Sequence, residues 1–151
     1  MALQFDWLMN LAVDVGEVTS MGEGPLGERR LIAILGGTFE GPELRGEVLP
    51  GGADWQMVGD DGAARLDARY TLETAGGALV QVSSQGLRHG PPAVLARLAA
   101  GEVVDPAQYY FRTVLRFETG AVDLGWLNRV IAVARGTRLP RAVELAAFEL
   151  L

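Results

Sequence analysis

The chain has 151 residues, a formal net charge of −6 and 49% hydrophobic residues, which suits one domain with a full core. It contains no Cys and one His, and all 13 of its basic residues are Arg. This composition excludes disulfides, thiol nucleophiles, cysteine-ligated metal sites and lysine Schiff-base chemistry.

The acidic charge balance works against non-specific binding to nucleic acid or to an anionic membrane surface, so we expect neither partner. The first residues lack the basic segment of a secretory signal, and no run reaches the roughly 18 apolar residues that a membrane span needs. We therefore expect a cytoplasmic protein that uses no metal or other cofactor. Whether copies of the chain form a homo-oligomer stays open.

Short apolar runs separated by Gly-rich turns predict an all-β sandwich or barrel, built as a single domain over residues 1–151. One short helix is predicted near Pro92–Ala100, because two prolines open it and Gly101 ends it. The predicted strands, in chain order, are Leu8–Val15, Arg29–Leu35, Leu44–Leu49, Trp55–Val58, Ala64–Thr74, Leu79–Leu87, Tyr109–Glu118, Trp126–Arg135 and Arg141–Leu150.

Two of these strands, Ala64–Thr74 and Tyr109–Glu118, alternate especially clearly between a mainly apolar and a mainly polar face. Such alternation places one face of a strand on the core and the other in a polar environment. That environment is either bulk water or a polar cavity inside a barrel, and the pattern fits both. The polar faces carry Asp67, Arg69 and Arg112.

Several segments of the chain form a recognisable series. In order they are Gly36–Pro42, Leu49–Gln56, Leu66–Tyr70, Tyr109–Thr113 with Phe117–Thr119, and Trp126–Arg129. Together they resemble a small, mostly bacterial family of uncharacterised proteins, domain of unknown function 3237. The resemblance covers nearly the whole chain and rests on the order of the segments. It implies an antiparallel β-barrel of the lipocalin-like general type, with about 8–10 strands and one short helix, and it implies no activity.

The polar strand faces supply the first candidate site. Asp67 and Arg69 are two residues apart on one strand, so their side chains point the same way. If these faces line a cavity, Arg69 and Arg112 would hold an anionic or enolisable group, and Asp67 would orient a guanidinium or move a proton. The alternative is an exterior ladder of cross-strand ion pairs.

Aromatic residues beside polar ones supply the other candidates. Asp54 precedes Trp55 at a Gly-rich bend, and desolvation beside an indole would raise the pKa of that carboxyl for acid–base work. Alternatively, Trp55 packs in the core and Asp54 caps its own turn. Trp126 and Asn128 would share a strand face as a ligand wall with an amide donor, or else serve as a core Trp and a turn-edge Asn. Tyr110 would donate a hydrogen bond at a pocket mouth or act in packing.

Two further patterns do not indicate a function. The segment Gly22–Gly27 matches the spacing of a dinucleotide-binding loop, but the next segment is a predicted strand rather than the helix that such a loop needs. Four arginines near the C-terminus are interpreted as the solvated end of the barrel; they are Arg129, Arg135, Arg138 and Arg141.

These residues favour a small-molecule-binding barrel that performs acid–base chemistry without a metal, as an isomerase, cyclase or lyase. One alternative is a non-catalytic carrier or sensor of an apolar ligand, and another is a structural or assembly barrel. The orientation of Arg69 and Arg112, into a closed cavity or into solvent, discriminates between the binding and the structural hypotheses.

Overall fold

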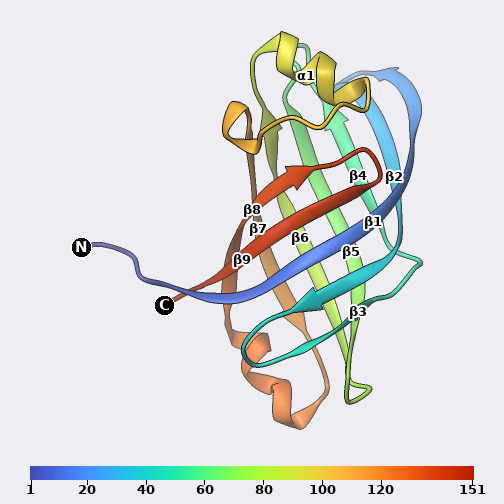
Figure 1. The fold of residues 1–151 in the computed structure, drawn as a ribbon. Helices are drawn as coiled ribbons and strands as arrows, with labels where there is room; N and C mark the ends of the chain where they lie inside the picture. Colours follow the sequence, from blue (N-terminus) through green and yellow to red (C-terminus); the bar gives the residue numbers. More distant parts are fainter.

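In the computed structural model, which describes residues 1–151, nine antiparallel strands close into a ring (Figure 1). The predicted antiparallel β-barrel of 8–10 strands is therefore confirmed. The strands are β1 (Phe5–Gly24), β2 (Gly27–Glu40), β3 (Arg45–Val48), β4 (Ala53–Val58), β5 (Ala64–Thr74), β6 (Leu79–His89), β7 (Tyr110–Glu118), β8 (Ile131–Arg138) and β9 (Ala142–Leu150).

The strands follow one another around the barrel in sequence order, and β9 closes the ring by pairing with β1. One position in the ring is shared, because β3 and β4 both lie between β2 and β5. The two chain ends lie side by side, where the backbone N–H of Leu151 donates to the carbonyl oxygen of Gln4 at 3.0 Å.

The strand β1 is much longer than predicted, because it continues past the barrel as a hairpin with β2. The end of that hairpin pairs Gly24 with Gly27. The glycine pattern of the segment Gly22–Gly27 therefore forms a strand turn and not the start of a helix.

Helices cover the two ends of the barrel. The predicted helix is confirmed as α1 (Pro92–Ala99), which lies at the top of Figure 1 and contains no buried residue. A short 3-10 helix, Pro106–Gln108, precedes β7. A longer one, Val122–Arg129, lies at the bottom and inserts Leu127 into the core. No helix of the structure combines the length and the apolar character needed to cross a membrane.

The predicted strand over Trp126–Arg135 is wrong in its first part, which belongs to the lower 3-10 helix. The Asn128 side chain fixes this segment by bonding Thr119 twice: Oδ1 accepts from the backbone N–H at 2.8 Å, and Nδ2 donates to the carbonyl at 3.0 Å. Trp126 and Asn128 therefore share no strand face.

The apolar faces of the strands point inward, where 26 buried residues form one cluster. On β5 the buried residues include Leu66, Tyr70 and Leu72, while Arg69 on the alternate face is exposed. The polar faces of β5 and β7 consequently face bulk solvent. The polar residues of these strands therefore lie in bulk water and not in a polar cavity inside the barrel.

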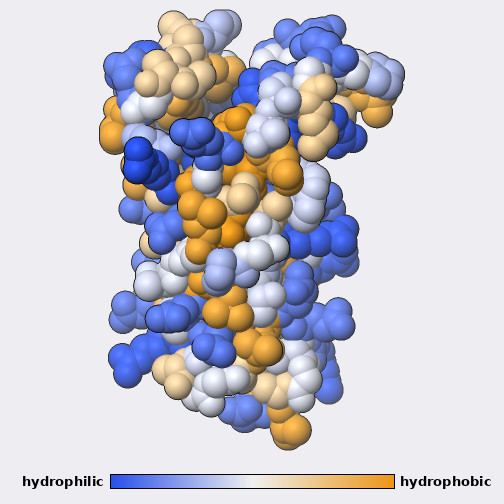
Figure 2. All heavy atoms as spheres, turned by 90° about the vertical axis from the view of Figure 1, so that its right-hand side faces the viewer, coloured by the Kyte–Doolittle hydropathy of each residue, from blue (hydrophilic) through white to orange (hydrophobic).

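The outer surface also carries hydrophobic side chains. Figure 2 shows them as a band down the middle of the face on the right of Figure 1, with hydrophilic atoms on both flanks. The strands β2 and β4 lie on this side of Figure 1 and carry the exposed residues Leu35 and Trp55.

Gly37 allows the first two strands to pair closely. It has a φ of +136°, and a Cβ at this position would lie 2.1 Å from the carbonyl oxygen of Ala12 on β1. Because that oxygen belongs to the backbone, it cannot move aside as a flexible side chain does. Any other residue would therefore separate β1 from β2.

We predict that Gly37→Ala lowers the free energy of unfolding by at least about 2 kcal/mol, because it adds both backbone strain and a clash. Gly120→Ala is the matched control, since a Cβ there meets nothing within 4 Å. The control should change stability by about 0.5 kcal/mol or less. Denaturant unfolding measures both variants, and equal effects would contradict the assignment.

Candidate functional site

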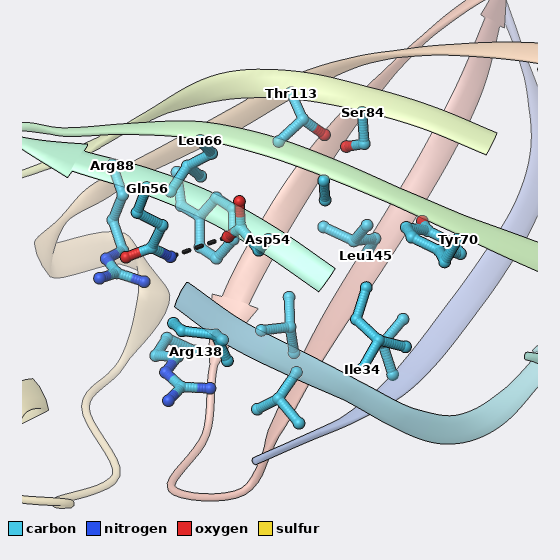
Figure 3. Close-up of a pocket in the computed structure, with 16 residues that line it drawn as sticks. Ile34, Asp54, Gln56, Leu66, Tyr70, Ser84, Arg88, Thr113, Arg138 and Leu145 are labelled. Atoms are coloured by element: carbon cyan, nitrogen blue, oxygen red, sulfur yellow. Dashed lines mark hydrogen bonds between the residues drawn. The ribbon is translucent and has the colours of Figure 1, made fainter. Parts of the chain in front are cut away.

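A cavity of about 50 Å³ lies inside the barrel and continues into a cleft of about 880 Å³ below α1. The two spaces share Gln56, Arg88 and Arg138 in their walls, together with apolar residues. Figure 3 shows the polar side chains of the cavity, which come from β4 to β8; they are Asp54, Gln56, Tyr70, Ser84, Arg88, Thr113 and Arg138.

Asp54 occupies the middle of this cavity and is bonded at both carboxylate oxygens. Oδ2 accepts a hydrogen bond from Nε2 of Gln56 at 2.8 Å, and Oδ1 accepts one from the backbone N–H of Asp67 at 2.9 Å. The backbone pairing of β4 with β5 includes Asp54 with Ala68 and Met57 with Arg65. Asp67 lies between these two pairs on β5, and its backbone N–H donates to the carboxylate of Asp54.

Burial raises the pKa of the Asp54 carboxyl above its ordinary value of 3.8. The hydrogen bonds from Gln56 and Asp67 and the charge of Arg88 oppose this rise without cancelling it. A carboxyl group that holds its proton more tightly than usual is better suited than an ordinary carboxylate to taking up a proton and returning it.

Arg88 reaches the cavity from the end of β6 and is supported by an aromatic ring. Its guanidinium carbon lies 5.8 Å from the centroid of the Phe111 ring, which belongs to its cross-strand partner on β7. The same ring lies against Gly136 of β8, where a Cβ would come within 2.5 Å of it. Gly136 thus makes room for the ring on which the guanidinium rests.

Arg138 enters from the end of β8, and its backbone N–H donates to the hydroxyl of the buried Tyr109 at 2.9 Å. Burial lowers the pKa of Arg138, while burial and the nearby charge of Arg138 lower the pKa of Arg88 to about 10. A guanidinium group keeps its charge at neutral pH in proteins, so both arginines are cationic. Neither has a carboxylate within ion-pairing distance, since the ion pairs of the chain are Arg30–Glu28 and Arg97–Glu102.

Four polar atoms in the cavity wall have no hydrogen-bond partner in the protein: Gln56 Oε1, Tyr70 Oη, Thr113 Oγ1 and Arg138 Nη1. The residues Gln56, Tyr70 and Thr113 are only 2%, 3% and 5% exposed. Buried polar groups are normally bonded, and each one left unbonded costs about 1–3 kcal/mol. A bound molecule with complementary polar groups would recover that free energy.

Asp54 is the predicted site residue that lines this cavity. Asp67 contributes only its backbone N–H; its side chain lies on the outer face and accepts from Gln85 Nε2 at 3.4 Å. Trp55 is also on the outer face, with 43% of its surface exposed. The hypotheses that Asp67 places its carboxylate inside the barrel and that Trp55 forms a pocket wall are therefore wrong.

Arg69 and Arg112 do not reach the cavity either. Arg112 lies outside β7, where its guanidinium carbon is 5.0 Å from the Tyr110 ring centroid and Nη1 donates to the carbonyl of Phe111 at 2.9 Å. Tyr110 stacks on His89 on the same outer surface. The hypothesis that Arg69 and Arg112 bind a ligand inside the barrel is therefore wrong, because the apolar faces of their strands point inward.

The remaining predicted residues, Trp126 and Asn128, lie at the end of the barrel opposite α1. Arg138 is predicted to lie at a solvated end of the barrel, but the structure places its side chain in the wall of the cavity. Arg88 and Arg138 each continue the inward register of a strand, after Val80, Val82 and Ser84 in the case of Arg88. This alternation is the feature of the sequence that could have placed both arginines on the inner face.

No group of three or more His, Cys, Asp or Glu side chains is placed to hold a metal ion.

Comparison with known proteins shows the family to which the chain belongs. The profile of a family described as "Protein of unknown function (DUF3237)" matches residues 2–150. The chain belongs to this family. The UPF0311 protein RPA1785 of Rhodopseudomonas palustris is 42% identical over 136 residues, which cover 90% of this chain and 89% of that protein. The resemblance stated from the sequence segments is thereby confirmed.

Solved structures of other proteins have a similar fold. The crystal structure of the R. palustris protein superposes with a TM-score of 0.95 at 38% identity and covers 100% of this chain and 99% of that chain. A β-barrel-like protein from Acinetobacter baumannii has a TM-score of 0.87 at 42% identity, with 100% and 98% coverage. An enzyme from Penicillium herquei, with a TM-score of 0.75, 21% identity and 100% and 96% coverage, is similar in fold alone.

We predict that Asp54→Asn stabilises the protein at pH 7. The raised pKa means that the folded state favours the protonated carboxyl, so the stability that Asp54 confers at low pH is lost as the pH rises through its folded pKa. Asn is neutral at every pH, and its amide can still accept from Asp67 and donate to Gln56 Oε1. The advantage of Asn should therefore shrink as the pH falls toward 4.

The measurement is the denaturant midpoint of wild type and variant at several pH values from 4 to 7. Asp67→Asn, the same replacement on the outer face, is the matched control and should change stability by about 0.5 kcal/mol or less. A variant that is less stable than wild type throughout this range would show that the Asp54 charge supports the fold.

Proposed function

We propose that this DUF3237 protein is an acid–base enzyme that binds a small organic anion inside the barrel and transfers a proton with Asp54. The supporting observation is the placement of two guanidinium groups without carboxylate partners, Arg88 and Arg138, in one cavity with a carboxyl of raised pKa. The cleft below α1 is lined by Arg88 and Arg138 and adjoins the cavity that contains Asp54.

Charge balance favours an anionic ligand. Arg88, Arg138 and an ionised Asp54 together leave the cavity with one excess positive charge, and burial of an unpaired charge is costly. A monoanion would neutralise it. The planar guanidinium fork matches a carboxylate with two parallel hydrogen bonds, so a carboxylate is the anion that these residues suit best.

The chemistry that follows is proton transfer without a change of oxidation state. Asp54 would take a proton from a carbon or oxygen of the substrate, and the arginines would stabilise the negative charge that remains. Isomerisation, cyclisation and elimination all proceed through such a step.

The apolar part of the cavity wall, which includes Ile32, Ile34 and Leu145, favours a second candidate function. A carrier or sensor would use this wall to bind an apolar ligand and would release it unchanged. Turnover discriminates between the two candidates: in an enzyme, Asp54→Asn should keep ligand affinity and reduce turnover by about 10²-fold or more. A carrier shows binding alone.

We predict that Arg88→Gln and Arg138→Gln each weaken the binding of small monocarboxylates by about tenfold or more, since hydrogen bonds between charged groups are worth about 1.5–3 kcal/mol. Arg69→Gln and Arg112→Gln on the outer face are the matched controls and should bind like wild type. Isothermal titration with pentanoate measures all five proteins. Equal losses in the interior and exterior variants would exclude the cavity as the anion site.

A further inference from the structure

The cavity wall carries three hydroxyls that the proposed proton transfer leaves without a role. Tyr70, Ser84 and Thr113 are buried in this wall, on three neighbouring strands. The oxygens of Tyr70 and Thr113 have no partner in the protein. In Figure 3, Asp54 lies between Tyr70 and the guanidinium groups of Arg88 and Arg138.

From this arrangement we propose that the substrate is an oxo acid, held by its carboxylate at Arg88 and Arg138 and by its carbonyl oxygen at Tyr70 and Thr113. This inference rests on the proposed function and specifies its substrate class. The carbon that loses a proton would then lie between the two anchored groups, opposite Asp54. A carboxylate and a carbonyl separated by one or two carbon atoms fit this order.

The hydroxyls are suited to a carbonyl oxygen because they are neutral donors. Burial raises the pKa of the Tyr70 phenol well above its ordinary value, with a smaller contribution from the charge of Asp54, so Tyr70 keeps its proton. A neutral donor aimed at a carbonyl oxygen stabilises the negative charge that develops there during enolisation. A carbonyl oxygen is an acceptor, which is what the unbonded hydroxyls of the cavity wall lack.

The proton-transfer step balances without an oxidant or reductant. A carboxylate oxygen of Asp54 takes a proton from the carbon next to the carbonyl, and the electron pair of that C–H bond forms a carbon–carbon double bond. The π electrons of the carbonyl move to its oxygen, which accepts hydrogen bonds from Tyr70 and Thr113. The protonated Asp54 then returns the proton to the same carbon or to another atom of the enolate.

The volume of the cavity limits the size of the group that enters it. One water molecule needs about 10–15 Å³, so about 50 Å³ holds only a few non-hydrogen atoms. The oxo acid therefore places a short carbonyl-bearing end beyond Asp54. Any longer substituent extends into the cleft below α1.

Three compounds of similar size test the inference: 4-oxopentanoate, pentanoate, which lacks the carbonyl, and 2-pentanone, which lacks the carboxylate. By isothermal titration, wild type should bind 4-oxopentanoate about tenfold more tightly than pentanoate, and 2-pentanone most weakly. In D₂O, proton NMR should show wild type exchanging the C3 hydrogens of 4-oxopentanoate faster than those at C5. Asp54→Asn should abolish that exchange.

Tyr70→Phe and Thr113→Val isolate the carbonyl contact. Both replacements nearly preserve shape and remove a hydroxyl that has no partner, so the melting temperature should stay the same or rise. Each variant should bind pentanoate like wild type and lose most of the preference for 4-oxopentanoate. A merely structural role for the hydroxyls would instead lower the melting temperature and leave the preference intact, which would overturn the inference.

The two levels of the proposal fail in different ways. If pentanoate and 4-oxopentanoate bind equally and Arg88→Gln weakens both, the anion site holds and the oxo-acid inference is wrong. If none of the three compounds binds, or if binding is independent of Arg88, the proposed function is wrong as well.

Discussion

The first strand pairs with the last from Phe5 with Leu150 to Asp14 with Ala142, and this pairing removes both free edges of the sheet. Closure gives every strand an inner and an outer face, so the parity of a residue decides whether it meets the core or water. It also encloses the carboxyl of Asp54 and the guanidinium groups of Arg88 and Arg138 in a space of low polarity. The shifted pKa values of these groups follow from that enclosure, because desolvation is their largest cause.

Within the closed ring, the irregular position shared by β3 and β4 supplies the carboxyl group of the site. The chain passes close to β5 at Gly52, where a Cβ would lie 2.3 Å from the carbonyl oxygen of Arg69. It then enters β4 with Asp54 turned inward and bonded to the backbone of the adjacent strand. A carboxylate anchored in this way is fixed in orientation, whereas the nearby guanidinium groups are left without a counter-ion.

The sequence predicted the architecture better than it predicted the site. The strand Ala64–Thr74 was predicted with its observed bounds, because its alternation is unbroken and turn residues flank it. The interior arginines were missed because a polar residue at the end of an inward register, such as Arg138 after Ala132 and Ala134, resembles one that emerges into solvent. Only the fold shows that α1 and the neighbouring turns enclose that end. Asp54 was identified because its bend and adjacent indole suggested desolvation, although burial inside the barrel is what raises its pKa.

The adjacent chain ends have a consequence for the connectivity of the barrel. Because residues 4 and 151 are already hydrogen-bonded, a short peptide could join the two ends without stretching β1 or β9. New ends could then be opened at an exposed hairpin, such as the turn near Gly76 and Gly77 between β5 and β6. The order of strands around the ring would be unchanged in such a circular permutant, since each strand would keep both of its neighbours.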